Sequence, residues 1–438
     1  MIAWGVRLVR SLWARPFRAL AVLLLPALAA AGGANLWAWH HLREANRLAE
    51  RQQFAAAYAH YADCLRVWRW SASTHFLAGR AARRAGLYDE AERHLAECRR
   101  LQDSASGPPL PLALERLLLQ AQSGDIAGVE DVLWGYVKKD APESPLILEA
   151  LARGYQRMFR MGMALRCLQM ILERDPDNVE ALVMRGWIRE GGGEPEDASK
   201  DFRRALELDP TRDDARLSLA RILIRDNCEE ARELFEGLAA RRPDDRNVLT
   251  GLAQAYYGVG QSEKARPIFE ALIAKDPQDC KALTGLGVLT LDEGDTAAGE
   301  ALLRRAVAAD PGNPEAHFQL YMCLLQQDGR AAEAAAEGET HKRVQADRER
   351  LAQIAVTEMT RRPYDPNLHY ELGAIYLRNG KPDVGVRWMY SALRLDPAHQ
   401  PSHQALADYF ERTGETEKAQ QHRRQLRGEA SNSSTAQP

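Results

Sequence analysis

The stretch Pro243–Asp276, PDDRNVLTGLAQAYYGVGQSEKARPIFEALIAKD, begins with a proline, holds two amphipathic segments and is followed directly by Pro277. Prolines in a similar context recur along the chain, and most successive ones are 34 residues apart. They are Pro142, Pro176, Pro210, Pro243, Pro277, Pro311, Pro363 and Pro397. This period in a helix-forming sequence is typical of a two-helix unit that buries its apolar face by stacking on its neighbours. The sequence therefore predicts a stacked array of helical hairpins.

Residues at fixed distances before these prolines share their size. A large apolar residue eight positions before most of them is predicted to fill the space between the helices: Leu168, Phe202, Phe235, Phe269, Leu303 and Met389. A small residue twelve positions before lets the helices approach closely: Ala164, Ala198, Ala231, Ala265, Gly299 and Gly385. The proline then ends the second helix, since it has no N–H and disfavours a helical residue before it. Glu300 is expected on the outer, solvated face.

This pattern resembles the tetratricopeptide repeat, because Asp209-Pro210, Asp276-Pro277 and Asp396-Pro397 stand where that family ends a unit. The resemblance implies an all-α solenoid, wound as a right-handed superhelix, of about eleven hairpins over residues 40–427. Pro311 and Pro363 are further apart than one period. The surplus predicts a lengthened or additional helix at about residues 330–362. The small, polar tail 428–438 is expected to be disordered.

The N-terminal region has the pattern of a membrane anchor. Residues 1–18 carry four arginines and no acidic residue, and residues 19–39, ALAVLLLPALAAAGGANLWAW, carry no charge. At about 1.5 Å per residue such a helix spans roughly 30 Å, the hydrocarbon core of a bilayer. Trp37 and Trp39 end the run, where aromatic rings suit the membrane interface. We expect one transmembrane helix with a basic cytoplasmic N-terminus.

A cleaved signal peptide is the alternative, because Ala27, Leu28 and Ala29 form a small-residue cleavage site after a short apolar block. Both interpretations export the repeats. The anchored form would lie in the inner, cytoplasmic membrane with its repeats in the periplasm, and the cleaved form would be secreted or periplasmic. The abundance of Ala, Arg and Leu also looks bacterial.

Composition and motifs argue against catalysis, cofactors and nucleic acid. The net charge of -3 lacks the basic excess of a nucleic-acid binder. The six cysteines form no C-x-x-C motif, and no G-x-S-x-G sequence occurs. His399 and His403 are four residues apart, but Pro401 between them marks a helix start, so we expect no metal site. We predict a protein that is not an enzyme and has no cofactor.

The predicted binding surface lies on the first helices of the hairpins, which line the concave side of such a solenoid. The positions in phase are Arg153, Trp187, Arg221, Gln254, Tyr257, Phe318 and Met322. Trp, Tyr and Arg often dominate binding energy, because they combine contact area with directional polar groups. We expect a membrane-tethered interaction scaffold that holds a protein or peptide in this groove. The alternative is a structural or assembly factor of an envelope or secretion complex.

Overall fold

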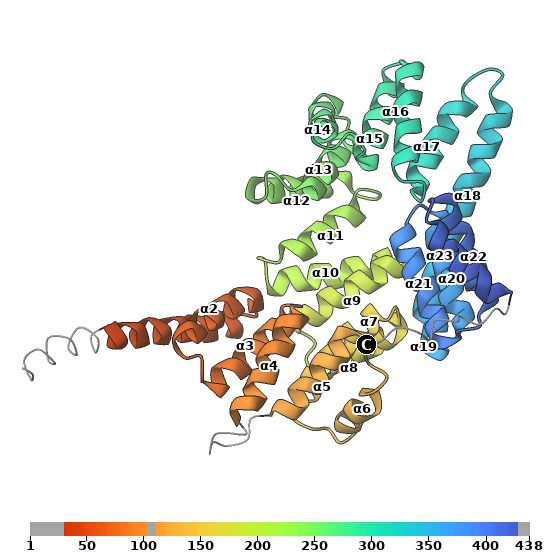
Figure 1. Ribbon diagram of the computed structural model, residues 1–438. Coiled ribbons are helices and arrows are strands. Elements are labelled where there is room, and N and C mark those ends of the chain that lie inside the picture. Colours follow the sequence, from red (N-terminus) through yellow and green to blue (C-terminus); the bar gives the residue numbers. More distant parts are fainter. Residues whose placement is uncertain (1–29, 103–110, 428–438) are drawn as a thin grey trace, which may run out of the picture. The chain divides into compact units, whose positions relative to one another are not determined.

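The computed structural model describes residues 30–102 and 111–427, which are helical with short turns and contain no strand (Figure 1). They form two compact units, the first ending at Arg157 and the second beginning at Met158. The first unit holds a helix over residues 30–50, then α2 Phe54–Val67, α3 Ala72–Arg84, α4 Tyr88–Gln102, α5 Leu112–Ser123, α6 Glu130–Lys138 and α7 Ser144–Arg157.

The second unit continues as a run of hairpins. Its helices are α8 Met161–Arg174, α9 Val179–Gly192, α10 Pro195–Leu208, α11 Asp213–Leu223, α12 Cys228–Arg241, α13 Arg246–Gly258, α14 Ser262–Lys275, α15 Cys280–Asp292, α16 Thr296–Ala309, α17 Pro314–Leu325, α18 Ala331–Gln353, α19 Met359–Arg361, α20 Pro366–Arg378, α21 Pro382–Leu395, α22 Gln400–Arg412 and α23 Thr416–Leu426. A π-helical segment, η1 Ile354–Glu358, joins α18 to α19. This order confirms the predicted all-helical solenoid.

Two details of the predicted architecture need correction. Eleven hairpins would use 22 helices, but the described residues contain the helix over 30–50 and the segment η1 in addition to the 22 helices α2 to α23. No helix within residues 30–102 or 111–427 is long and apolar enough to cross a membrane. The expected transmembrane helix 19–39 falls largely outside the described residues, as do the N-terminal stretch 1–18 and the tail 428–438.

The large residues predicted eight positions before each proline fill the interior of the hairpins. Phe235 and Phe269 are almost completely buried, as are their counterparts in the neighbouring hairpins. The next first helix brings a glycine against each ring: a Cβ on Gly251 would lie 2.2 Å from the Phe235 ring, and one on Gly285 2.3 Å from Phe269. Burying a Phe side chain contributes about 1.5–3 kcal/mol relative to exposure. The sequence register is confirmed at these positions.

The start of several first helices is fixed by a short polar side chain after the proline. Asn178, Asp245 and Asp279 cap α9, α13 and α15, because each side-chain oxygen accepts a hydrogen bond from a backbone N–H of the first turn. Such a cap contributes about 1 kcal/mol to helix stability. The caps set where each first helix begins, and they thereby place its side chains in the same phase from one hairpin to the next.

A histidine pair replaces the apolar contact between the two helices of some hairpins. In α15–α16 the position is filled by Leu283 and Leu302, which belong to one apolar cluster. In α22–α23 it is filled by His403 and His422, whose Nδ1 atoms are 2.9 Å apart. The pair His75–His94 in α3–α4 has the same geometry, with 3.1 Å between the Nδ1 atoms. One packing position therefore accepts two different chemistries.

Hydrogen bonds define the tautomer of each ring in the last hairpin. His403 donates from Nε2 to the carbonyl of Pro397, 3.0 Å away, so its Nδ1 accepts. His422 therefore donates from Nδ1, and its Nε2 accepts from the hydroxyl of Tyr390 at 3.3 Å. Burial, with a smaller contribution from His403, lowers the pKa of His422 to about 4. His422 is therefore neutral at neutral pH, and both nitrogen atoms of each ring have a hydrogen-bond partner.

The residues between Pro311 and Pro363 bring distant parts of the second unit together. They form α17, α18, η1 and α19, and the last two contact α8 at the start of the unit (Figure 1). A Cβ on Gly162 of α8 would lie 2.2 Å from the carbonyl oxygen of Val356, so only glycine fits there. Phe159, with a left-handed φ of 59°, places its ring 5.8 Å from that of Trp388. The second unit thus closes on itself through this contact.

Candidate protein-binding surface

Side-chain hydrogen bonds join the first helix α9 to α11 and the first helix α13 to α15. The indole N–H of Trp187 on α9 donates to Ser218 on α11 at 3.1 Å, and the hydroxyl of Tyr257 on α13 donates to Asp292 on α15 at 2.7 Å. Arg221 of α11 forms an ion pair with Glu190 of α9, with an N–O distance of 2.9 Å. Within the row of first helices from α9 to α17, these bonds fix side chains of α9 relative to α11 and side chains of α13 relative to α15.

The charges of this row influence one another. Burial raises the pKa of Glu190, while the positive charges of Arg221 and Lys281 oppose that rise. Lys281 is exposed on α15, two hairpins beyond Arg221, so its field reaches a carboxylate on α9. Burial, followed by the hydrogen bond to Asp292, raises the pKa of Tyr257 to about 12. Its hydroxyl therefore stays protonated as a donor at physiological pH.

An apolar stripe runs along α17. Phe318 and Met322 are 38% and 37% exposed, and Leu325 is 50% exposed. Their spacing of four and then three residues puts them on one face of the helix. Leu325 was missed from the sequence because the repeat phase was followed at only a few positions, although its spacing from Phe318 and Met322 would have identified it. We call Phe318, Met322 and Leu325 the α17 stripe.

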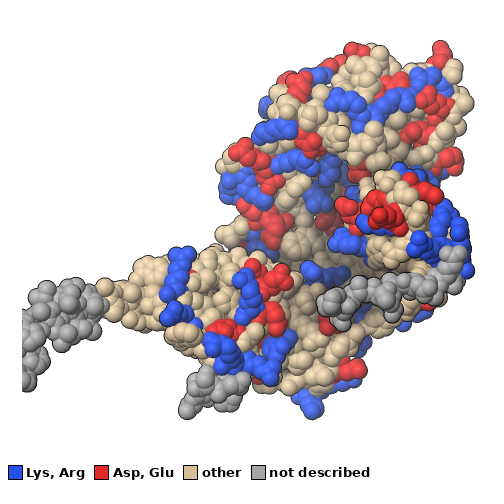
Figure 2. Space-filling model, in the orientation of Figure 1, with Lys and Arg blue, Asp and Glu red and all other residues tan. Residues whose placement is uncertain are grey.

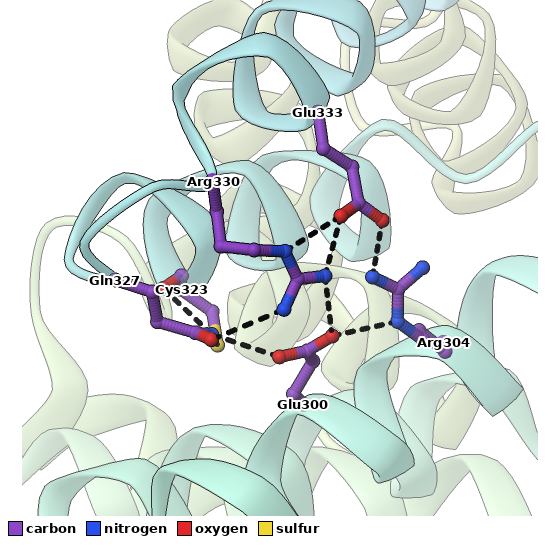
Figure 3. Close-up of polar contacts among 6 residues, drawn as sticks. All are labelled: Glu300, Arg304, Cys323, Gln327, Arg330 and Glu333. Carbon is purple, nitrogen blue, oxygen red and sulfur yellow. Dashed lines mark hydrogen bonds and ion pairs between the residues drawn. The ribbon is translucent and has the colours of Figure 1, made fainter.

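A network of ion pairs holds the α17–α18 turn on α16, and so fixes the α17 stripe (Figure 3). Glu300 of α16 accepts hydrogen bonds from Arg304 at 2.8 Å, from Gln327 at 2.8 Å and from Arg330 at 3.2 Å. Glu333 of α18 accepts from both Arg304 and Arg330. Hydrogen bonds, chiefly from Gln327, hold the pKa of Glu300 below its usual range.

Glu300 is therefore not an ordinary solvent-exposed residue. Its side chain is only 15% exposed and joins α16 to the α17–α18 turn, which corrects the expectation that it would lie on a solvated outer face. Sequence phase placed it next to the small residue Gly299, but the arginines that reach it come from its own helix and from the following hairpin. Its hydrogen-bond partners from the following hairpin could be identified only from the stacking seen in the structure.

Six of the seven residues predicted for the groove lie in the second unit, on α9, α11, α13 and α17. Trp187 and Gln254 are partly buried, whereas Arg221, Tyr257, Phe318 and Met322 are exposed. The seventh, Arg153, belongs to α7 of the first unit and lies 3.4 Å from Glu149. The candidate surface is thus the row of six together with Leu325. No group of three His, Cys, Asp or Glu side chains in the described ranges is arranged to hold a metal.

Comparison with known families confirms the repeats. A tetratricopeptide-repeat family model matches residues 149–213, 184–246, 225–279 and 250–314, and a second tetratricopeptide-repeat model matches residues 290–355. The chain therefore carries tetratricopeptide repeats across most of the second unit. No curated protein matches it. These matches agree with the register of prolines, small residues and buried rings described above.

Several solved structures are similar to this chain at low identity. The tetratricopeptide-repeat protein TTC0263 of Thermus thermophilus is 23% identical, covering 41% of this chain and 98% of that one, with a TM-score of 0.35. The human IFIT1 dimer with m7Gppp-AAAA is 17% identical over 82% of this chain and 90% of that one, with a TM-score of 0.37. YrrB, described as having an unusual peptide-binding site, is 15% identical over 55% and 98%, with a TM-score of 0.28. Such distant likenesses carry no argument about ligands.

Proposed function

We propose that this tetratricopeptide-repeat chain is a membrane-tethered scaffold whose first-helix row in the second unit binds an extended segment of another protein. The α17 stripe is the observation that carries the proposal. Exposed apolar side chains gathered on one helix face favour a binding site over a solvated surface. Three such residues on α17 would bury their apolar area against a partner's side chains.

Polar groups on the neighbouring helices supply direction. Tyr257, Gln254 and Lys281 offer hydrogen-bond groups on α13 and α15, next in the row to α17. An extended peptide has unpaired backbone N–H and C=O groups that require such partners when they leave water. The proposed ligand is therefore a segment with apolar side chains at one end and an acidic or amide-rich stretch near Lys281.

The tether is proposed from the start of the first unit. The helix over 30–50 exposes its residues 31–33 and 35–37, and Ala38 is its first buried residue. These exposed residues are almost all apolar, and a helix that is apolar on every face belongs in a protein core or a membrane. The uncharged run 19–39 continues into them. We place the repeats in the periplasm at the inner membrane, with a cleaved, periplasmic form as the alternative.

A photo-crosslinking amino acid at Met322 tests the groove in the native membrane protein. The matched control is the same substitution at Leu395, which is also 37% exposed but lies on the second helix α21. We expect one dominant crosslinked protein from position 322 and none of that species from position 395. Equal crosslinking from both positions, or none from 322, would reject the groove.

Point substitutions then quantify the interaction with the crosslinked partner. Phe318→Ser combined with Met322→Ser should weaken it about 30-fold, as expected for loss of a 2 kcal/mol hot spot. Leu395→Ser should leave it unchanged. Helical content and melting temperature should also stay near those of the original chain, since both stripe residues are exposed. An assembly factor would instead give a persistent hetero-complex that survives the double substitution.

A further inference from the structure

Tryptophans and arginines gather at the end of the first unit where the apolar N-terminal run enters it. The indole N–H of Trp68 donates to the side chain of Asn35 at 2.7 Å, and the thiol of Cys64 donates to the carbonyl of Ala38 at 3.2 Å. The end of α2 and the turn that follows it therefore lie beside residues 35–38. That turn brings Arg69 and Trp70 to the same end of the unit.

Large apolar side chains remain exposed here. Leu36 is 71% exposed, Trp39 51% and Trp70 63%. Among the exposed tryptophans of residues 30–102 and 111–427, Trp70 is the most exposed. An indole left in water forfeits a large burial energy unless another surface covers it. These side chains come from two separate segments, so the exposure is a property of the folded unit.

Arginines stack on the exposed indoles. The Arg43 guanidinium lies 4.8 Å from the ring centroid of Trp39, the Arg69 guanidinium 4.9 Å from that of Trp70, and the Arg100 guanidinium 5.7 Å from the same ring. We call these five residues the collar. Arg100 also pairs with Glu97, but within the described ranges no carboxylate forms an ion pair with Arg43 or Arg69. Figure 2 shows a tan projection at this end of the unit, followed by blue side chains.

We infer that the collar docks on the headgroup layer of an anionic phospholipid bilayer, which rests on the membrane tether proposed above. Amphipathic indole rings prefer the boundary between hydrocarbon and headgroups. Arginines near an anionic surface are each attracted by about 1 kcal/mol, or about fivefold in binding. The collar combines both groups at the place where the uncharged run reaches the folded unit. It would hold the first unit against the membrane instead of leaving it on a free stalk.

Fluorescence quenching in proteoliposomes of the full chain tests this docking. Lipids brominated high on the acyl chain quench only indoles that reach the bilayer, so the difference between the original chain and Trp70→Phe reports Trp70 alone. We expect that difference signal to be quenched by more than half in vesicles with phosphatidylglycerol. The matched control, Trp388→Phe in the second unit, should give an unquenched difference signal. An unquenched Trp70 signal would overturn the docking.

Charge is tested by a second set of vesicles. Arg43→Glu combined with Arg69→Glu should lower the docked fraction of Trp70 strongly, about fivefold for each arginine removed, and the effect should vanish with purely zwitterionic lipid. Arg412→Glu, an exposed arginine of α22, is the control and should change nothing. If quenching of Trp70 is the same in the double variant as in the original chain, the anionic headgroup is rejected as the ligand. A protein occupant would instead shield Trp70 from quenching when a second copy or a partner is present.

Extraction with alkaline carbonate separates this inference from the tether. If the chain stays in washed membranes but Trp70 is unquenched, the tether is supported and docking of the collar is rejected. A chain released by carbonate loses the tether, and the collar is then judged by flotation of the released full chain with anionic vesicles. Flotation that depends on Trp70 and Arg69 supports the collar independently, and absence of flotation rejects it.

Discussion

The α15–α16 hairpin and the α22–α23 hairpin fill the space between their two helices with different kinds of side chain. The former places Leu283 and Leu302 between its helices, and the latter places His403 and His422 there. Before the former hairpin, α14 carries the buried Phe269 eight residues ahead of its proline, whereas the same repeat position of the last hairpin holds the partly buried Arg423. The comparison teaches that the repeat requires a filled interface and not an apolar one. Hydrogen bonds can replace apolar area if every polar atom is paired.

The largest expected effect removes the buried ring that the last hairpin lacks. Phe269→Ala should cost about 3–5 kcal/mol, because it deletes a buried aromatic side chain and leaves a cavity. Arg423→Ala, at the equivalent position of α23, should cost less than about 1 kcal/mol, since its ion pairs with Asp408 and Glu411 are exposed. Urea unfolding measures both. Equal effects would mean that the repeat register does not extend to the last hairpin.

A glycine substitution probes how tightly the regular hairpins pack. Gly251→Ala should destabilise by about 1–3 kcal/mol, because its methyl group would meet the Phe235 ring. Gly237→Ala lies inside the neighbouring helix α12 with no atom within 4 Å of the added methyl, and it should stabilise by up to about 1 kcal/mol. Thermal unfolding of the two variants should therefore shift in opposite directions. Shifts of the same sign would contradict the packing.

Lowering the pH should destabilise the α22–α23 hairpin, which holds the histidine pair, through a group that the α15–α16 hairpin lacks. The folded pKa of His422, about 4, lies below the ordinary value of 6.5, so the unfolded chain binds more protons between these values. The contribution of His422 to the free energy of unfolding is therefore complete above about pH 6.5 and falls as the pH drops towards 4. At pH 5 it has fallen by about 2 kcal/mol. His403→Leu combined with His422→Leu, which copies Leu283 and Leu302, should remove that part of the loss.

The measurement compares urea midpoints at pH 7.5 and pH 5 for both chains. Carboxylates titrate equally in the two, so the difference isolates the histidine pair. The groups that face His422 are His403, Tyr390 and the ring of Phe410, which is stacked on it at 6.0 Å. An unchanged acid response in the leucine variant would show that protonation of this pair is not coupled to unfolding.

The smallest effect concerns Glu300. Glu300→Ala should cost about 1–2 kcal/mol, because it leaves Gln327 and Arg330 without their shared acceptor at a largely buried site. Glu339→Ala on α18 is the control: its ion pair with Lys342 is exposed, and its loss should stay within about 0.5 kcal/mol. Matching melting temperatures for the two variants would place Glu300 back on the solvated surface.

The repeat was predictable from the sequence because each hairpin buries the same positions. Phe235 and Phe269 occupy the interior at the expected spacing, and the caps at Asn178 and Asp245 follow the expected prolines. Features that depend on three-dimensional stacking were not predictable. The hydrogen bonds of Glu300 join α16 to the α17–α18 turn, and the contact between Gly162 and Val356 joins segments with no common sequence pattern.

The candidate surface was predicted in part. Repeat phase placed Trp187 and Tyr257 on the first helices, but it could not show that each donates a hydrogen bond to the next first helix. It also omitted Leu325 and included Arg153, which lies in the first unit. A phase rule treats every hairpin alike, whereas exposure depends on where the array lengthens or divides.

The contact of Gly162 with η1 sets a limit on how this array can evolve. An open solenoid gains or loses a repeat at little cost, because each unit touches only its neighbours. Here α8 meets η1 and α19, so deletion or duplication of one hairpin between them would move Val356 away from Gly162. The number of repeats in this arc is therefore fixed by geometry, and homologues that keep a glycine at this position should keep the same repeat count.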